Sequence, residues 1–182
     1  ARDDSNIAKV VCVASSPTIR ENALLGIFHP AFNLHGSSAR IIDNYISVDW
    51  DGDGIRSFAS DSSLIMNNTF EARDMDVNSF IRCENSFNRI IGNDLGGVAD
   101  PISCSGGSYE ILNNYIEWTF YCETAAISCY GSIATISGNT VMGTIAVGSG
   151  SYRIENNWIR GGDNSESYGG GISCSNVDST TM

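Results

Sequence analysis

One asparagine-centred pattern occurs seven times along the chain and constrains its fold more than any other feature. Each copy places an aliphatic residue three positions before an Asn and an apolar residue two positions after it, as in Ile111, Asn114 and Ile116. The repeated residues lie 18 to 25 positions apart and are Asn22, Asn44, Asn68, Asn93, Asn114, Asn139 and Asn157. A repeat of this length is typical of proteins in which one structural unit stacks on the next.

A second column of residues supports the same register. Ten positions before each Asn we expect an inward-facing side chain, from Cys12, Leu34, Phe58, Cys83, Cys104, Cys129 and Val147. Two positions earlier lies another column, made of Val10, Phe32, Arg56 (or Ile55 beside it), Ile81, Ile102, Ile127 and Ile145. Ile172 to Cys174 begins an eighth unit. The length differences between units fall after the Asn, where the gap to the next column residue varies from 8 to 17 positions.

These pairs of apolar residues predict short strands, because alternate side chains of a strand point to the same face. Three strands per unit, joined by turns rich in Asn, Gly and Ser, wind into one coil of a parallel β-helix. We expect the repeated Asn to adopt the left-handed backbone conformation of a tight bend. Successive Asn side chains, about 4.8 Å apart, are expected to form a hydrogen-bonded ladder.

The repeats resemble the right-handed parallel β-helix repeats of the pectin-lyase-like superfamily and of bacteriophage tailspikes, roughly from residue 10 to residue 174. The predicted fold is therefore all-β, a right-handed single-stranded parallel β-helix of about seven to eight coils with three short strands per coil. Residues 1–182 are expected to form a single β-helix domain. Because the ends offer little polar cover for terminal coils, we expect this domain to be a segment of a longer chain that lacks its caps.

The charge of the chain limits its partners. Asp and Glu number 21 against 10 Lys and Arg, which gives a net charge of −11 and a pI near 4.3. This balance argues against nucleic acid or an anionic membrane surface as a partner. No apolar run approaches the about 18 residues of a membrane span, so membrane insertion is not expected.

Five of the six cysteines occupy the inward column, namely Cys12, Cys83, Cys104, Cys129 and Cys174. Parallel side chains in register point the same way rather than at each other, so reduced core thiols are expected instead of disulfides. Reduced thiols fit assembly in a reducing cytosol. No CxxC pair is present, which argues against zinc. Cys122 lies in a variable loop and is expected to be accessible.

One acidic loop has the form of a cation-binding motif. Asp49, Asp51 and Asp53 alternate with Trp50 and Gly52, as at the start of many calcium loops. The acidic residue expected at position twelve is absent, because Ser60 stands there. Two interpretations stay open: a Ca²⁺ site formed by the three aspartates, or a solvated acidic turn. No other cofactor is required.

Three carboxylates form the candidate catalytic group. Glu71 and Glu117 each lie three positions after a repeated Asn, two coils apart, and Asp94 lies one position after the Asn of the coil between them. Twice the strand separation places the two Glu Cα atoms about 9 to 10 Å apart. Glycoside hydrolysis requires such a pair, one acid and one base or nucleophile. The alternative is that acidic residues of a highly acidic chain lie together by chance.

Exposed aromatic residues are the candidate sugar-binding groups, because their rings can stack on sugars. Tyr45, Tyr115 and Trp158 share the position after the repeated Asn. With Arg82, which points outward beside Cys83, the substrate-binding candidates are Trp50, Tyr115, Trp118, Tyr121, Trp158 and Arg82. The alternative role for the aromatic residues is packing against a neighbouring subunit.

The family resemblance gives the functional expectation. Tailspikes of this fold are typically homotrimers that bind and cleave host surface polysaccharide. The resemblance thus implies a tail protein of the virion that binds bacterial capsule or O-antigen and hydrolyses it with paired carboxylates. Two alternatives stay open: a secreted pectate-lyase-like polysaccharide lyase, and a non-catalytic β-helical shaft or adhesin. The lyase would need an Arg or Lys base beside acidic calcium ligands, and no such cluster is evident in the sequence.

Overall fold

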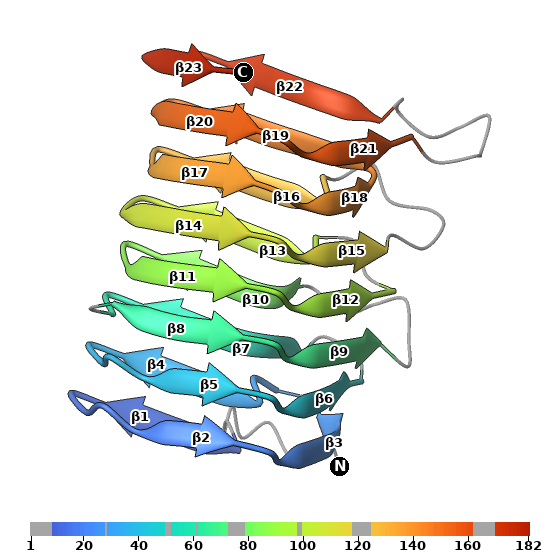
Figure 1. Ribbon diagram of the computed structural model, residues 1–182. Helices are drawn as coiled ribbons and strands as arrows, with labels where there is room; N and C mark the ends of the chain where they lie inside the picture. The colour runs from blue at the N-terminus through green and yellow to red at the C-terminus, as the bar shows by residue number, and fades with distance from the viewer. Residues whose placement is uncertain are drawn as a thin grey trace, which may run out of the picture.

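The computed structural model describes residues 9–27, 29–49, 52–60, 62–72, 79–97, 100–117, 125–161 and 170–182. Within these ranges the regular structure consists of 23 β-strands in three parallel sheets (Figure 1). These residues contain no helix that is long and apolar enough to cross a membrane.

The first two sheets have eight strands each. Sheet A consists of β1 (Val10–Val13), β4 (Phe32–His35), β7 (Asp53–Phe58), β10 (Ser79–Glu84), β13 (Ile102–Ser105), β16 (Ile127–Tyr130), β19 (Thr144–Gly148) and β22 (Gly171–Ser175). Sheet B consists of β2 (Thr18–Arg20), β5 (Arg40–Ile42), β8 (Ser63–Met66), β11 (Phe87–Ile91), β14 (Ser108–Leu112), β17 (Ile133–Ser137), β20 (Ser151–Glu155) and β23 (Ser179–Thr181).

The third sheet has seven strands and carries the candidate site. Sheet C consists of β3 (Ala23–Ile27), β6 (Tyr45–Val48), β9 (Thr69–Ala72), β12 (Asp94–Gly96), β15 (Tyr115–Glu117), β18 (Thr140–Met142) and β21 (Trp158–Arg160).

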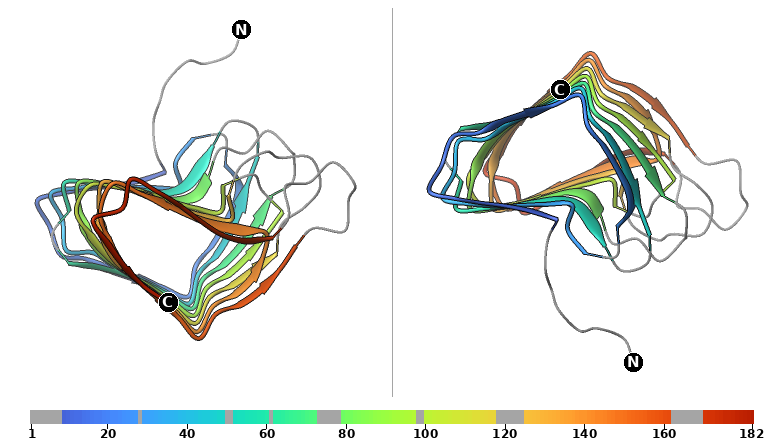
Figure 2. Two further views of the ribbon diagram at one scale, coloured as in Figure 1. Left: turned by 90° about the horizontal axis from the view of Figure 1, so that it is seen from above. Right: turned by 90° about the horizontal axis from the view of Figure 1, so that it is seen from below.

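Consecutive strands belong to sheets A, B and C in turn, so three strands make one coil, as predicted. Seen along the axis from the C-terminal end, the chain turns counterclockwise as it approaches the viewer, which makes the coil right-handed (Figure 2). The strands of sheet C end, and those of sheet A begin, along one edge of the molecule. This is the edge where the length of the units varies in the sequence.

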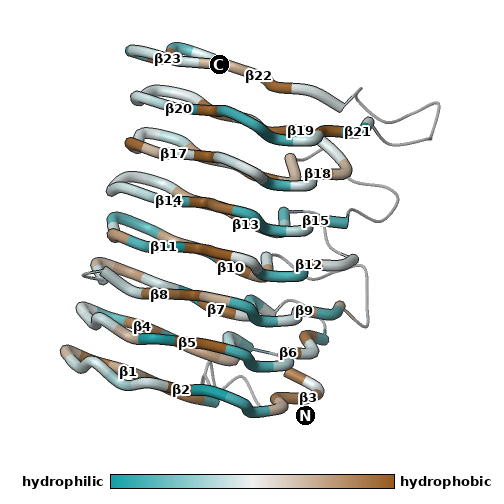
Figure 3. Tube along the Cα trace, viewed as in Figure 1, coloured by the Kyte–Doolittle hydropathy of each residue, from teal (hydrophilic) through white to brown (hydrophobic). Residues whose placement is uncertain are grey.

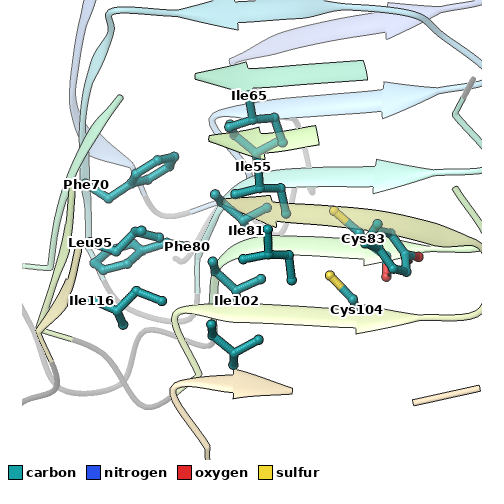
Figure 4. Close-up of a cluster of buried hydrophobic side chains, with 14 of the residues drawn as sticks. Ile55, Ile65, Phe70, Phe80, Ile81, Cys83, Leu95, Ile102, Cys104 and Ile116 are labelled. Carbon is teal, nitrogen blue, oxygen red and sulfur yellow. Dashed lines mark hydrogen bonds between the residues drawn. The ribbon is translucent and has the colours of Figure 1, made fainter. Parts of the chain in front are cut away.

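The core is a set of apolar columns inside the coil. Apolar segments recur at corresponding places in successive coils (Figure 3). Ile55, Ile81 and Ile102 are neighbours in register on sheet A, and all three are fully buried (Figure 4). The structure thus places Ile55, and not Arg56, in the inward column. A fully buried Ile or Phe contributes about 1.5–3 kcal/mol through the removal of its apolar surface from water, so these columns stabilise the stacking of the coils.

The prediction of reduced core thiols is confirmed for Cys12, Cys83, Cys104 and Cys129, whereas Cys174 is a free thiol that is exposed. Cys83, Cys104 and Cys129 are paired in register on sheet A, they are buried, and they are free thiols. Burial raises the pKa of the Cys104 thiol well above its usual range, and contacts with the thiols of Cys129 and Cys83 raise it further. Cys104 is therefore an inert core residue.

The asparagine ladder is confirmed, and it crosses the bend between sheets B and C. In one rung, Oδ1 of Asn114 accepts hydrogen bonds from the backbone N–H and from Nδ2 of Asn93, at 2.9 and 3.0 Å. Nδ2 of Asn114 donates to Oδ1 of Asn139 at 3.0 Å and to the carbonyl oxygen of Ile90 at 2.9 Å. Each internal Asn thus ties its own coil to the coils on both sides.

The prediction that the ladder Asn itself is left-handed is wrong. The positive φ angles belong to the residue before each ladder position, which is Glu21, Asp43, Asn67, Gly92, Asn113, Gly138 or Asn156, with φ from 53° to 68°. The bend therefore divides two tasks between neighbouring residues. One residue reverses the backbone, and the following Asn supplies the side-chain hydrogen bonds.

A second regular bend joins sheets A and B. Next to this bend, the observed register differs from the predicted register at one position. Ser57, rather than Phe58, pairs with Leu34 and Cys83 in the inward column, while Phe58 is 39% exposed. The spacing to Asn68 is thus one residue longer than the ten expected. The additional residue lies between Ser57 and Ile65, a stretch in which Ala59 and Ser62 have positive φ angles of 47° and 60°.

Candidate functional site

The candidate catalytic residues lie on the outer face of sheet C, on three neighbouring strands. In β9, β12 and β15, Phe70, Leu95 and Ile116 point into the core and are at most 2% exposed. Since successive side chains of a strand alternate between its faces, the residues beside them face solvent. Among these are Glu71, Asp94 and Glu117, all exposed.

The register of sheet C places a glycine between the two glutamates. Gly96 is the partner of Glu71 on one side and of Glu117 on the other. The two Glu Cα atoms are therefore two strand separations apart, about 9 to 10 Å. A Cβ atom added to Gly96 would meet nothing within 4 Å, so the space above this glycine is open. We call Glu71, Gly96 and Glu117 the glutamate notch.

The three carboxylates have different surroundings. The hydroxyl of Tyr45, one coil below, donates a hydrogen bond to Oε2 of Glu71. The side chains of Asp94 and Glu117 have no hydrogen bond or ion pair with the part of the chain that the structure describes. Glu71 is consequently held in place by the protein, whereas Asp94 and Glu117 are available to a ligand.

The aromatic residues of sheet C share one outward column, as expected. Its members follow one another from coil to coil in the order Ala23, Tyr45, Thr69, Asp94, Tyr115, Thr140 and Trp158. Tyr115 is 39% exposed and Trp158 is 54% exposed. The two rings lie on either side of Thr140 and on the same face as the glutamate notch.

Arg82 is not part of this face. It lies on β10 in sheet A, between Arg56 and Ser103, and its Nε donates to Oε1 of Glu84 at 2.9 Å. The structure therefore separates Arg82 from the other substrate-binding candidates on sheet C.

The predicted calcium loop is described only in part. Asp53 begins β7 and is 2% exposed, and its Oδ2 lies 2.8 Å from Nη2 of Arg56. Burial raises the pKa of Asp53, and the positive charge of Arg56 partly opposes that shift. The described residues contain no group of three His, Cys, Asp or Glu side chains arranged to hold a metal ion. Because Asp51 lies outside them, the Ca²⁺ site formed with Asp49 remains a prediction.

Other candidates also lie outside the described residues. These are Trp50, Trp118, Tyr121 and Cys122. Their expected roles in substrate binding or, for the cysteine, as an accessible thiol stay predictions.

Sequence reasoning missed two features of the site. Gly96 occupies the position that Glu71 and Glu117 occupy in the neighbouring coils, so counting three residues from Asn93 identifies it. The contact between Tyr45 and Glu71 is harder to predict from the sequence, because it joins two outward columns and depends on the length of both side chains.

The fold and these contacts define the chain as a parallel β-solenoid with an acidic and aromatic outer face on sheet C. No protein-family model, no curated protein and no solved structure matches this chain.

Proposed function

We propose that this protein binds a bacterial surface polysaccharide along the outer face of sheet C and hydrolyses it with Glu71 and Glu117. The observation that carries the proposal is the glutamate notch, in which two exposed carboxylates flank an open glycine on a rigid sheet. The Cα separation of about 9 to 10 Å is compatible with the carboxyl spacing of inverting glycosidases, about 6.5–9.5 Å, which leaves room for a water molecule.

The chemistry divides between the two glutamates. Glu117 donates a proton to the glycosidic oxygen as its bond to the anomeric carbon breaks. Glu71, oriented by Tyr45, accepts a proton from the water molecule that forms the new bond to that carbon. The products are two shorter chains, one with a new reducing end. Asp94, on the strand between them, stabilises the positive charge that develops on the sugar ring.

The aromatic column supports binding along the axis of the solenoid. Tyr115 and Trp158 present partly exposed rings on the same face as the notch. A sugar chain that runs parallel to the axis stacks on these rings while one of its linkages lies at Gly96.

The biological setting follows from the resemblance of the repeats to those of tailspikes. It supports a homotrimer in the tail of a virion, with capsule or O-antigen as the polysaccharide. A secreted polysaccharide lyase is the alternative setting, and a non-catalytic shaft or adhesin is the alternative without chemistry.

The test is to incubate the protein with a panel of capsular polysaccharides and O-antigens. Chain length, new reducing ends and the absorbance of unsaturated uronates are followed together. Shortened chains with reducing ends and no absorbance support hydrolysis. Absorbance contradicts the proposed chemistry and indicates a lyase. Binding of a polysaccharide without shortening of its chains would indicate a non-catalytic adhesin or shaft.

Two variants then test the assigned residues. Glu71→Gln and Glu117→Gln should each lower turnover about a hundredfold, the usual contribution of an acid or base. Glu110→Gln is the matched control, because Glu110 is an exposed glutamate on β14 of the same coil as Glu117 and lies on sheet B. Full activity in both sheet C variants would remove Glu71 and Glu117 from the mechanism.

A further inference from the structure

The charged residues of the solenoid are segregated between its faces. Arg20, Arg40, Arg89 and Arg153 lie on sheet B, and Arg56 and Arg82 lie on sheet A. Among the described residues, the one cationic side chain on a strand of sheet C is Arg160, on β21 near the C-terminal end. Among the described residues, the carboxylates at the centre of sheet C thus have no arginine on a neighbouring strand of that sheet.

The ion pairs between carboxylates and arginines are divided between the sheets in the same way. Glu84, Glu110 and Glu155, on sheets A and B, lie 2.9, 2.6 and 3.0 Å from arginine Nε atoms. Buried Asp53 and exposed Glu21 are also paired with arginines. Neither Asp94 nor Glu117 has such a partner in the described chain, and Glu71 accepts its hydrogen bond from a neutral phenol. Within the ranges that the structure describes, no cationic side chain therefore pairs with these three carboxylates.

The carboxylates of Glu71, Asp94 and Glu117 lie on strands of fixed spacing, so a ligand that runs along sheet C must pass all three. They belong to three successive strands, about 4.8 Å apart, whose backbones are fixed by pairing on both sides. A sugar chain that runs along the axis meets one carboxylate per coil over three coils. An anionic group on each repeating unit would meet like charge at every step, within a chain whose net charge is already −11.

We infer that the polysaccharide bound by sheet C is neutral or carries amino groups, and that polymers bearing uronate, sulfate or phosphate groups are rejected. This inference rests on the proposed function and names its substrate class. Neutral sugar hydroxyls donate hydrogen bonds to the carboxylates, and ammonium groups gain attraction as well. It also separates this face from lyase chemistry, since β-elimination acts on a uronate.

The experiment compares one glycan in two charge states. All binding is measured in the Glu117→Gln background, which limits turnover, with far-UV circular dichroism to verify the fold. If the polysaccharide that binds from the panel is neutral, its primary alcohols are oxidised to carboxylates. If it is acidic, its carboxylates are reduced to primary alcohols. The neutral form should bind about tenfold more tightly at about 0.01 M salt, from the two like-charge contacts, with Glu71 and Asp94, that remain in this background in a mostly aqueous setting.

The location of the effect is tested by a second substitution. Asp94→Asn, added to the background, should narrow the difference between the two glycan forms to about threefold. Glu110→Gln, which changes the net charge equally on sheet B, should leave the affinity difference between the two glycan forms unchanged. About 0.5 M salt should reduce this affinity difference in every variant, because screening shortens the range of the repulsion.

The outcomes separate the two proposals. Equal or tighter binding of the anionic form overturns the substrate class and leaves polysaccharide binding intact. An equal effect of Glu110→Gln overturns the assignment to sheet C, because net charge then explains the selectivity. Binding of no polysaccharide overturns the proposed function together with this inference. Binding of oligolysine alone would assign the face to a basic protein partner and overturn both.

Discussion

Two columns of residues run along this solenoid at the bend to sheet C, one of Asn side chains that are buried in the internal rungs and one, three residues later, of varied residues on the outer face. Asn114 is 1% exposed and forms hydrogen bonds to the coils on both sides. Three residues later, Glu117 is exposed and has no side-chain partner in the described chain. The Asn recurs in seven coils, whereas the outer position changes from coil to coil. The repeated column holds the coils together, and the departures from the repeat on the outer face are the residues available to a ligand.

The largest expected effect is on the inner column. Asn114→Ala leaves the backbone N–H of Asn93 and the carbonyl of Ile90 without their partner, and each buried orphan costs about 1–3 kcal/mol. We expect the free energy of unfolding to fall by about 3 kcal/mol in urea titrations. Asn22→Ala is the control, because Asn22 is exposed at the first rung. It should lose about 1 kcal/mol or less. Equal losses would show that the ladder does not act through both neighbouring coils.

Gly54, which is packed against the core, and Gly96, on the outer face of sheet C, give a second comparison of an inner and an outer position. A Cβ atom on Gly54 would lie 2.6 Å from the carbonyl oxygen of Phe80 and 2.8 Å from Cε1 of Phe70. Gly54→Ala should therefore lower the free energy of unfolding by about 1–3 kcal/mol, the usual effect of overpacking. Gly96→Ala should change it by no more than about 0.5 kcal/mol. A large loss in the second variant would mean that the notch is not open.

A bulkier residue at the same place tests the outer face directly. Gly96→Leu places a bulky side chain between Glu71 and Glu117, where an added Cβ atom meets nothing within 4 Å. We expect binding of the panel polysaccharide to weaken about tenfold, or about 1.4 kcal/mol. Gly171→Leu is the control, since Gly171 on β22 is equally open but lies in sheet A. Unchanged binding in Gly96→Leu would remove the notch from the binding surface.

The smallest expected effect concerns the buried charge of Asp53. Burial raises its pKa, so above the ordinary value of 3.8 the folded protein retains a proton that the unfolded chain has lost. The stability that this site contributes is present at low pH and is lost as pH rises through the raised pKa. Relative to the wild type, Asp53→Asn should gain stability between about pH 3 and about pH 7. Urea titrations across this range measure the trend, with Glu110→Gln as an exposed control; a constant difference would contradict it.

The repeat made the fold predictable, because every coil presents the same apolar spacing. The error at Phe58 shows where this reasoning ends. Ser57 occupies the inward position because its hydroxyl bonds to Oδ1 of buried Asn88 at 3.3 Å, and a count of apolar residues cannot find a polar interior position. The left-handed residue before each Asn was missed for a related reason. Its identity varies among Glu, Asp, Asn and Gly, so no residue type marks it.

The candidate site was predictable as far as register determines it. Counting from the Asn column placed Glu71, Asp94 and Glu117 on one face, which the strand pairing agrees with. The same count places Arg82 on sheet A, away from them. Asp53 could not be anticipated as a buried residue, because a motif of alternating aspartates carries no information about which carboxylate turns inward to meet an arginine.

The ladder also has a mechanical consequence. Because each internal Asn bonds to the coil before it and the coil after it, only an end coil lacks half of its rung. Tension applied along the axis should therefore peel the solenoid from its ends, one coil at a time, rather than break it in the middle. The released lengths would match the ladder spacings of 22, 24, 25, 21, 25 and 18 residues, beginning at whichever end of the ladder opens first. A force–extension trace would then show one step for each coil, and the length of each step would reflect the number of residues in that coil.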